Sequence, residues 1–340
     1  MNEKKDMTRK QKYLQFLLPS LDDGTIDKMI AVAMEKKKKQ ESACHSSDMD
    51  PYAKLRSMVG CENAKKQLDA MIANFRMRQI AQARGRSSAR AYYHAAFIGN
   101  PGCAKTTCAR LFAKVLAREG ITKSDLFGEL SRSDLVGQYM GATALKVREV
   151  FKKYKGGVIL IDEAYSLSDD KGGSNNSFGR EAINEMIVCL ENDPETVVIF
   201  SGYPDRMKEF LESNPGLVSR VPYRVVFEDY TTEELVEISK VMAEEQGYMI
   251  SEAALVKLSE IYESAKSRKD FGNGRYVRNV VEAAIRTKGI RLGVMENQDM
   301  SKFSNHLLYT DEELFSLDES CFEVKQEPPG ETCRKIGFCS

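Results

Sequence analysis

The chain contains a loop whose residue types and spacing suit the binding of a triphosphate. An apolar run predicts a strand ending near Ile98 before this loop, and a helix is expected after it, from about Thr106 to Arg118. Such a loop points its backbone N–H groups inward, and the helix start adds its positive dipole end. Lys105 is then placed to reach the β- and γ-phosphates, and the Thr106 hydroxyl to hold Mg²⁺. The residues that we expect to bind ATP here are Gly99, Asn100, Pro101, Gly102, Cys103, Ala104, Lys105, Thr106 and Thr107.

One position departs from the pattern G-x-x-x-x-G-K-[ST], because Ala104 stands where the pattern has its second glycine. If the backbone there has a positive φ, the Cβ costs about 1 kcal/mol or more, whereas a right-handed backbone accepts alanine without strain. The sequence leaves the effect of Ala104 on turnover open.

Two carboxylates follow a second strand of the predicted fold. The continuous apolar run at 157–161 is typical of a strand buried on both faces of a parallel sheet, and acids at its carboxyl end stand where such sheets bind ligands. Asp162 is expected to bind Mg²⁺ through water, and Glu163 to polarise the attacking water. Acids at strand ends also act as simple caps, but the upstream Lys-Thr loop favours nucleotide chemistry.

A glycine-flanked tip lies between these two features. Gly137 and Gly141 enclose Gln-Tyr-Met, and Thr143 is expected to cap the helix that follows. In the structural interpretation Tyr139 folds back on a turn; in the functional one it is exposed, projects into a central channel and grips a polypeptide. The two glycines favour exposure.

Composition limits the possible partners and compartment. Lys and Arg number 50, as do Asp and Glu, so no global charge attracts nucleic acid or an anionic membrane. The eight cysteines are scattered and contain no C-x-x-C pair, which is typical of reduced thiols in a cytosolic protein. No run approaches the roughly 20 apolar residues of a membrane span. We expect a cytoplasmic protein with no membrane partner, and the three histidines lack metal-ligand spacing.

These pieces together resemble the AAA+ ATPases of the CbbX and stage V sporulation protein K group, which also includes ATPases of type VII secretion. The resemblance covers about residues 52–290 and implies an α/β fold: an AAA+ P-loop NTPase αβα parallel sheet followed by a small helical lid. It also implies Mg-ATP hydrolysis in a homo-oligomeric ring, a hexamer by family likeness. The motifs that carry it are Gly-Asn-Pro-Gly-x-x-Lys-Thr (99–106), Asp-Leu-Val-Gly-x-Tyr-x-Gly (134–141), Ile-Asp-Glu-Ala-Tyr (161–165), Ser-Gly-Tyr (201–203), Ser-Asn-Pro-Gly-Leu-x-Ser-Arg (213–220), Asp-Tyr-Thr-Thr-Glu-Glu-Leu (229–235) and Gly-Asn-Gly-Arg-x-Val-Arg-Asn (272–279).

The resemblance assigns further roles residue by residue. Arg220 is implied to be an arginine finger that acts in the neighbouring subunit's site. The alternative is that Arg220 forms only a surface salt bridge. The first sensor of the γ-phosphate is Ser201 or Tyr203, where the family has Asn or Thr. The second sensor is Arg275 or Arg278, of which Arg275 is favoured because it stands at a helix start. A Val59-Gly60 step is implied to line the adenine pocket.

The chain divides by composition into four regions. Residues 1–50 predict a helical extension and linker, which either packs on the main domain or docks a partner. The nucleotide-binding domain is expected at 51–228. A lid is expected at 229–294, opening on the capping box at 231–234. Residues 295–340 predict a tail that is disordered or binds something.

The function indicated by these features is that of a ring ATPase that remodels an unknown protein client through Tyr139. One alternative is an ATP-gated assembly module with negligible turnover, suggested by Ala104 and the unusual first sensor. Another is a DNA-acting clamp-loader or helicase-type ATPase, against which the zero net charge stands.

Overall fold

The computed structural model describes residues 50–86, 91–139, 141–168, 176–268, 271–292 and 310–322. The chain divides into two compact units, Met1–Lys54 and Leu55–Ser340, and the second contains the central sheet and the lid. The extension expected at 1–50 falls almost wholly outside the described residues. A short helix, α3, covers Pro51–Ser57.

A five-stranded parallel sheet in the order β2-β3-β4-β1-β5 forms the centre of the larger unit. The interior strands consist mostly of apolar residues, and all four residues of β3 are buried, as expected for strands covered on both faces. This confirms the parallel α/β sheet predicted from the sequence. The strands are β1 (Ala95–Gly99), β2 (Phe127–Leu130), β3 (Val158–Ile161), β4 (Val197–Gly202) and β5 (Tyr223–Phe227).

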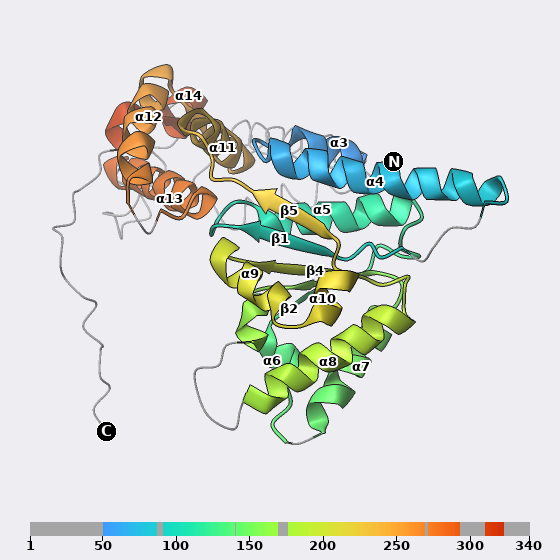
Figure 1. Cartoon of the computed structure of the whole chain (residues 1–340). Coiled ribbons are helices and arrows are strands. Elements are labelled where there is room, and N and C mark those ends of the chain that lie inside the picture. The colour runs from blue at the N-terminus through green and yellow to red at the C-terminus, as the bar shows by residue number, and fades with distance from the viewer. Residues whose placement is uncertain are drawn as a thin grey trace, which may run out of the picture. The chain divides into compact units, whose positions relative to one another are not determined.

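Helices cover both faces of this sheet (Figure 1). One face carries α4 (Glu62–Ala83) and α5 (Lys105–Arg118). The other face packs alternate strand residues, such as Ile159 and Phe200, into a core with the remaining helices. These are α6 (Arg132–Leu135), α7 (Ala142–Lys153), the 3₁₀ helix η2 (Ala164–Leu167), α8 (Asn176–Asn192), α9 (Pro204–Glu212) and α10 (Pro215–Arg220).

A helical lid follows the sheet, with its own hydrophobic core. Thr231 and Glu234 form the expected capping box at the start of the first helix, and residues such as Leu258, Tyr262 and Val281 are completely buried. The three lid helices are α11 (Thr232–Glu245), α12 (Glu252–Lys266) and α13 (Gly274–Arg291).

The lid differs from expectation at its carboxyl end, because part of the expected tail at 295–340 folds onto it. There α14 (Asp311–Phe315), β7 (Ser316–Leu317) and η5 (Glu319–Phe322) succeed one another, and β7 pairs in parallel with β6 (Met249–Ile250). Leu317 and Phe322 are buried in the lid core. Elements this short leave no periodic pattern, which is why the sequence predicted a tail. Residues 293–309 and 323–340 lie outside the described part.

The prediction that Thr143 caps α7 is wrong. The cap position is Gly141 in the left-handed conformation, and Thr143 is buried inside the first turn. The Thr143 hydroxyl oxygen accepts a hydrogen bond from the N–H of Gly137 at 3.1 Å. Thr143 therefore closes the base of the tip that carries Tyr139.

Candidate nucleotide-binding site

The phosphate loop begins where β1 ends, at the carboxyl edge of the parallel sheet. The ends of β3 and β4 lie on the same edge, because the three strands are neighbours in the order β3-β4-β1. The edge thus gathers Lys105, Asp162 and Glu163, together with the two first-sensor candidates. This is the crevice where ligands bind in open α/β sheets.

Lys105 lies against the loop from which it comes. Its ammonium donates hydrogen bonds to the carbonyl oxygens of Gly99 at 2.8 Å and Asn100 at 2.7 Å. Burial lowers the pKa of Lys105, while the neighbouring Cys103 and Asp162 act in the opposite sense. A partly desolvated cation at this point is suited to a phosphate, whose charge replaces the solvation that burial removes.

The backbone at Ala104 is left-handed, with φ 57° and ψ 22°. The pattern's glycine is therefore replaced at a position where a Cβ is strained by about 1 kcal/mol or more. Gly102 is left-handed as well, and a Cβ there would lie 2.1 Å from the carbonyl oxygen of Gly272. The loop therefore keeps a glycine at position 102, where a side chain would collide with Gly272, and it carries backbone strain at Ala104.

The two carboxylates follow β3 directly. Glu163 is exposed and left-handed, with φ 48°, and its N–H donates to Asp162 at 3.0 Å. Asp162 and the Thr106 hydroxyl are hard oxygen donors of the kind that Mg²⁺ prefers when phosphates complete its shell. In the described part of the chain, no three His, Cys, Asp or Glu side chains gather to hold a metal alone. Asp162 and Thr106 are therefore of the right chemistry for a Mg²⁺ whose remaining ligands are phosphate oxygens and water.

The two first-sensor candidates differ in environment. Ser201 is completely buried inside β4, and its hydroxyl has no hydrogen-bond partner among the described residues. Tyr203 follows the strand and stacks on Tyr165, with ring centroids 5.6 Å apart. Ser201 is thus the candidate with unused hydrogen-bonding capacity. Leaving a buried polar group without a hydrogen-bond partner costs about 1 to 3 kcal/mol.

The two second-sensor candidates differ in whether they approach the phosphate loop. Both Arg275 and Arg278 are exposed on α13. The charge of Arg275 acts on Lys105, and a Cβ added at Gly102 would lie 3.0 Å from the backbone nitrogen of Arg275. The structure brings Arg275 to the phosphate loop; no such contact is found for Arg278 among the described residues.

The carbonyl group just before the Val59-Gly60 step is held by a lysine that sequence reasoning missed. Gly60 has φ 65° and lies against Tyr230, where a Cβ would be 2.8 Å from the ring. Lys65, only 5% exposed, donates to the carbonyl oxygen of Met58 at 2.6 Å and to Glu62 at 2.7 Å. Glu62 and Lys65 stand three residues apart, a spacing that brings opposite charges together on one face of a helix, and that spacing was the available signal.

Arg220 lies at the amino edge of the sheet, where the strands begin, and the phosphate loop lies at the carboxyl edge, where they end. It ends α10, just before β5, and the first residue of β5 pairs with Ala95 at the amino end of β1. The phosphate loop follows Gly99 at the other end of that five-residue strand, roughly 13 Å away at 3.3 Å per residue. The fold therefore does not bring Arg220 to the phosphate loop of its own chain.

The Arg220 side chain is held by an acid. Its guanidinium donates to Glu191 at 2.6 Å, and its side chain is 19% exposed. Its buried Nε has no hydrogen-bond partner within the described segments. The cation is therefore fixed on one side and incompletely satisfied on the other.

Tyr139 is 76% exposed, as the glycine-flanked pattern predicted. It stands in the connection between α6 and α7, and its carbonyl oxygen accepts from the N–H of Ala142 at 3.1 Å. The side chain is accessible to another molecule.

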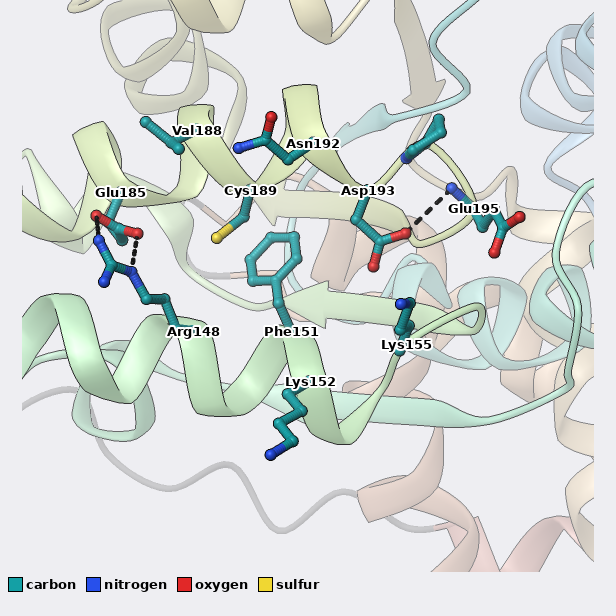
Figure 2. Close-up of a pocket in the computed structure, with 11 residues that line it drawn as sticks. Arg148, Phe151, Lys152, Lys155, Glu185, Val188, Cys189, Asn192, Asp193 and Glu195 are labelled. Carbon is teal, nitrogen blue, oxygen red and sulfur yellow. Dashed lines mark hydrogen bonds and ion pairs between the residues drawn. The ribbon is translucent and has the colours of Figure 1, made fainter.

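A groove of about 640 Å³ lies between α7 and α8. Figure 2 shows Phe151 and Cys189 pointing toward one another between the helices, with Arg148 bound to Glu185 at 2.5 Å beside them. Asp193, at the other end, accepts from the N–H of Glu195 at 3.3 Å. The groove adjoins the carboxyl end of α8, which leads to the amino end of β4, so it is separate from the nucleotide edge.

Comparison with known proteins agrees with this geometry. The AAA model, described as "ATPase family associated with various cellular activities", matches residues 95–229, and the AAA lid domain model matches residues 231–317. None of the helices in the described residues is long and apolar enough to cross a membrane.

The relatives found span most of the chain. Stage V sporulation protein K of Bacillus subtilis is 36% identical over 280 residues, 81% of this chain and 83% of that protein. The chloroplastic ribulose bisphosphate carboxylase/oxygenase activase of Cyanidioschyzon merolae is 37% identical over 249 residues, 73% of this chain and 84% of that protein. The CfxQ homologue of Guillardia theta is 40% identical over 230 residues, 67% of this chain and 78% of that protein. With this site and these relatives, the chain belongs to the AAA ATPase family, in the group of stage V sporulation protein K and CfxQ.

Proposed function

We propose that this protein hydrolyses Mg-ATP at sites formed between neighbouring copies in a ring, and uses Tyr139 to remodel a protein client. The observation that carries the proposal is the separation of the catalytic residues. Lys105, Asp162 and Glu163 belong to the carboxyl edge of the sheet, whereas Arg220 belongs to the amino edge. A complete site then needs the carboxyl edge of one copy and the amino edge of the next, and such head-to-tail contacts form a ring when the rotation between copies closes.

The chemistry at this shared site follows from the charges of the described residues. Lys105 binds the β- and γ-phosphates after leaving the carbonyl oxygens of Gly99 and Asn100. Thr106 and Asp162 would hold Mg²⁺, which would supply positive charge against the negative charge that develops on the phosphates. Glu163 accepts the proton of the attacking water.

The arginine of the neighbouring copy completes the reaction. A cation supplied in this way stabilises the transition state and is worth about 10³ to 10⁵ in rate. The place of Arg220 at the amino edge supports this role, because a single partly exposed ion pair with Glu191 is worth only about 1 kcal/mol and leaves the guanidinium able to exchange partners.

The proposed client is a polypeptide. The exposed aromatic ring of Tyr139 supports this, since an apolar side chain on a short tip can grip a chain of any sequence. One relative is named as the activase of an enzyme, which supports a protein as the target here.

The arrangement is tested by mixing two inactive variants. Arg220→Ala retains the catalytic set and Glu163→Gln retains the arginine, so each alone should lose hydrolysis. Mixed in equal amounts with ATP, they should regain activity, because roughly a quarter of the head-to-tail interfaces then combine intact halves. Arg224→Ala, at an exposed arginine of β5, is the control and should hydrolyse ATP as the wild type does.

Failure of this test has distinct forms. If Arg220→Ala alone keeps full activity, or if gel filtration with Mg-ATP finds only monomers, the shared site is wrong. If the wild type turns over no faster than Lys105→Ala yet assembles with ATP, the protein is an ATP-gated assembly module. Turnover that only DNA stimulates would indicate the clamp-loader or helicase alternative.

The role of Tyr139 is tested by retention of the client. Glu163→Gln should hold ATP and its client together, and the double variant Glu163→Gln with Tyr139→Ala should release the client while ATP stays bound. Retention that is equal in both proteins rules out threading through Tyr139.

A further inference from the structure

Asn273 is the residue immediately before α13, at the point where the lid meets the phosphate loop. It is completely buried, and its backbone has φ 46° and ψ −126°. Few residues other than glycine adopt a positive φ, and they do so where the surrounding contacts hold them. The conformation of Asn273 is therefore maintained by its partners.

Both polar atoms of the Asn273 side chain are used. Its amide nitrogen donates to the carbonyl oxygen of Pro101 at 3.3 Å and to the carboxylate of Asp229 at 2.8 Å. Its amide oxygen accepts from the N–H of Tyr230 at 3.1 Å. The next residue, Gly274, donates its own N–H to the carbonyl oxygen of Gly102 at 3.1 Å, where a Cβ at Gly274 would lie 2.9 Å from that oxygen.

These bonds turn two successive carbonyl groups of the phosphate loop toward the lid. In a trans peptide the C=O of one residue and the N–H of the next point in opposite directions. With the carbonyls of Pro101 and Gly102 drawn outward, the N–H groups of Gly102 and Cys103 point away from the lid contact. That is the arrangement by which a loop cradles an anion.

Asp229 extends the connection to the start of the loop. Its carboxylate accepts from the Asn100 amide at 2.9 Å and from the Cys103 thiol at 3.5 Å, in addition to Asn273. Burial, and then Asp229, raise the pKa of Cys103 to about 12, so the thiol keeps its proton and remains a donor.

We infer that Asn273, together with Asp229, is a positioning residue for phosphate binding: it orients the loop's amide groups from the lid side. The inference rests on the ATP site proposed above. It also makes the loop's shape depend on the lid, because Asn273 precedes α13 in the lid while Pro101 and Gly102 follow β1 in the sheet.

The test compares nucleotides that differ in phosphate number. Asn273→Gly removes the side-chain bonds while accepting the backbone conformation. Its affinity for ADP should fall about tenfold, and its affinity for AMP, which has no β-phosphate for the loop to hold, by less than about threefold. The measurement is displacement of a fluorescent ADP analogue, with Asn74→Ala as control. Asn74, on α4, donates to Tyr223 away from the loop, and its loss should leave both affinities unchanged.

Two further variants keep the inference falsifiable if Asn273→Gly does not fold. Asn273→Asp keeps the shape and the bond from Tyr230 but loses both donations, and it should weaken ADP more than AMP. Asp229→Ala, at an exposed position, should do the same to a smaller extent.

The outcomes separate this inference from the proposed function. An equal loss of ADP and AMP affinity means that Asn273 only holds the lid in place and overturns the positioning role. Unchanged ADP affinity overturns it too, while leaving the ATP site intact. A wild-type protein that binds neither ADP nor ATP overturns both.

Discussion

The two edges of the central sheet differ in how their residues are held. The carboxyl edge is strained, since all four non-glycine residues with positive φ in the described part of the chain belong to the nucleotide site or border it: Cys61, Ala104, Glu163 and Asn273. At the amino edge, Arg220 and the α7–α8 groove use regular helices and paired charges. Strain of this kind is typical of functional sites, and among the described residues the amino edge is built without it.

The largest test of this contrast is Glu163→Gln. If the left-handed backbone at Glu163 serves to aim a catalytic base, the substitution should lower kcat by about 10² to 10⁴ while ATP affinity stays within a few fold. Steady-state hydrolysis and nucleotide titration measure the two quantities. A comparable loss in Glu185→Gln, which breaks the Arg148 ion pair across the groove, would show that the edges are not distinct in this sense.

Ala104→Gly tests whether the phosphate loop is strained. Glycine relieves a left-handed backbone by about 1 to 2 kcal/mol and loses part of that gain to the unfolded state, so the free energy of unfolding should rise by roughly 0.5 to 1 kcal/mol. Ala117→Gly, in the right-handed part of the same helix, should lower it by about the same amount. Denaturant melts of the two variants decide the matter, because both must change with opposite signs.

Glu191→Gln tests the amino edge. If Glu191 competes with the neighbouring phosphate for Arg220, weakening the ion pair should raise kcat about threefold, within the roughly 1 kcal/mol that a partly exposed pair is worth. The rate is measured at saturating ATP and at several protein concentrations. A fall in kcat would instead assign Glu191 the task of orienting the guanidinium.

The smallest effect concerns the short helix before Tyr139. Hydrogen bonds from Ser131 lower the pKa of Asp134, so its stabilising effect is present above the unfolded-state pKa near 4 and is lost as the pH falls through the folded value. Asp134→Asn should therefore cost less than about 1 kcal/mol at pH 6, and the difference from the wild type should shrink by pH 3. Thermal melts at the two pH values measure it, and a constant difference would contradict the carboxylate's role.

Local patterns predicted most of the carboxyl edge. A β-branched run ending in Asp162 and Glu163, and a glycine loop ending in Lys105, are contiguous signals whose residues reach one edge because parallel strands end together. The hydrogen bond from Asn273 to Pro101 could not be predicted in this way, because its partners are 172 residues apart and one of them is a backbone carbonyl.

The sequence by itself therefore determined the parallel sheet, the residues available for phosphate and metal, and the exposed Tyr139, since each depends on neighbours along the chain. Only the tertiary structure decided that Ala104 is left-handed, that Arg275 rather than Arg278 reaches the loop, and that residues 310–322 complete the lid. It also decided that Arg220 lies at the far edge of the sheet, bound to Glu191. These features depend on which distant segments pack together, and packing distances across the fold are not encoded in any local run of residues.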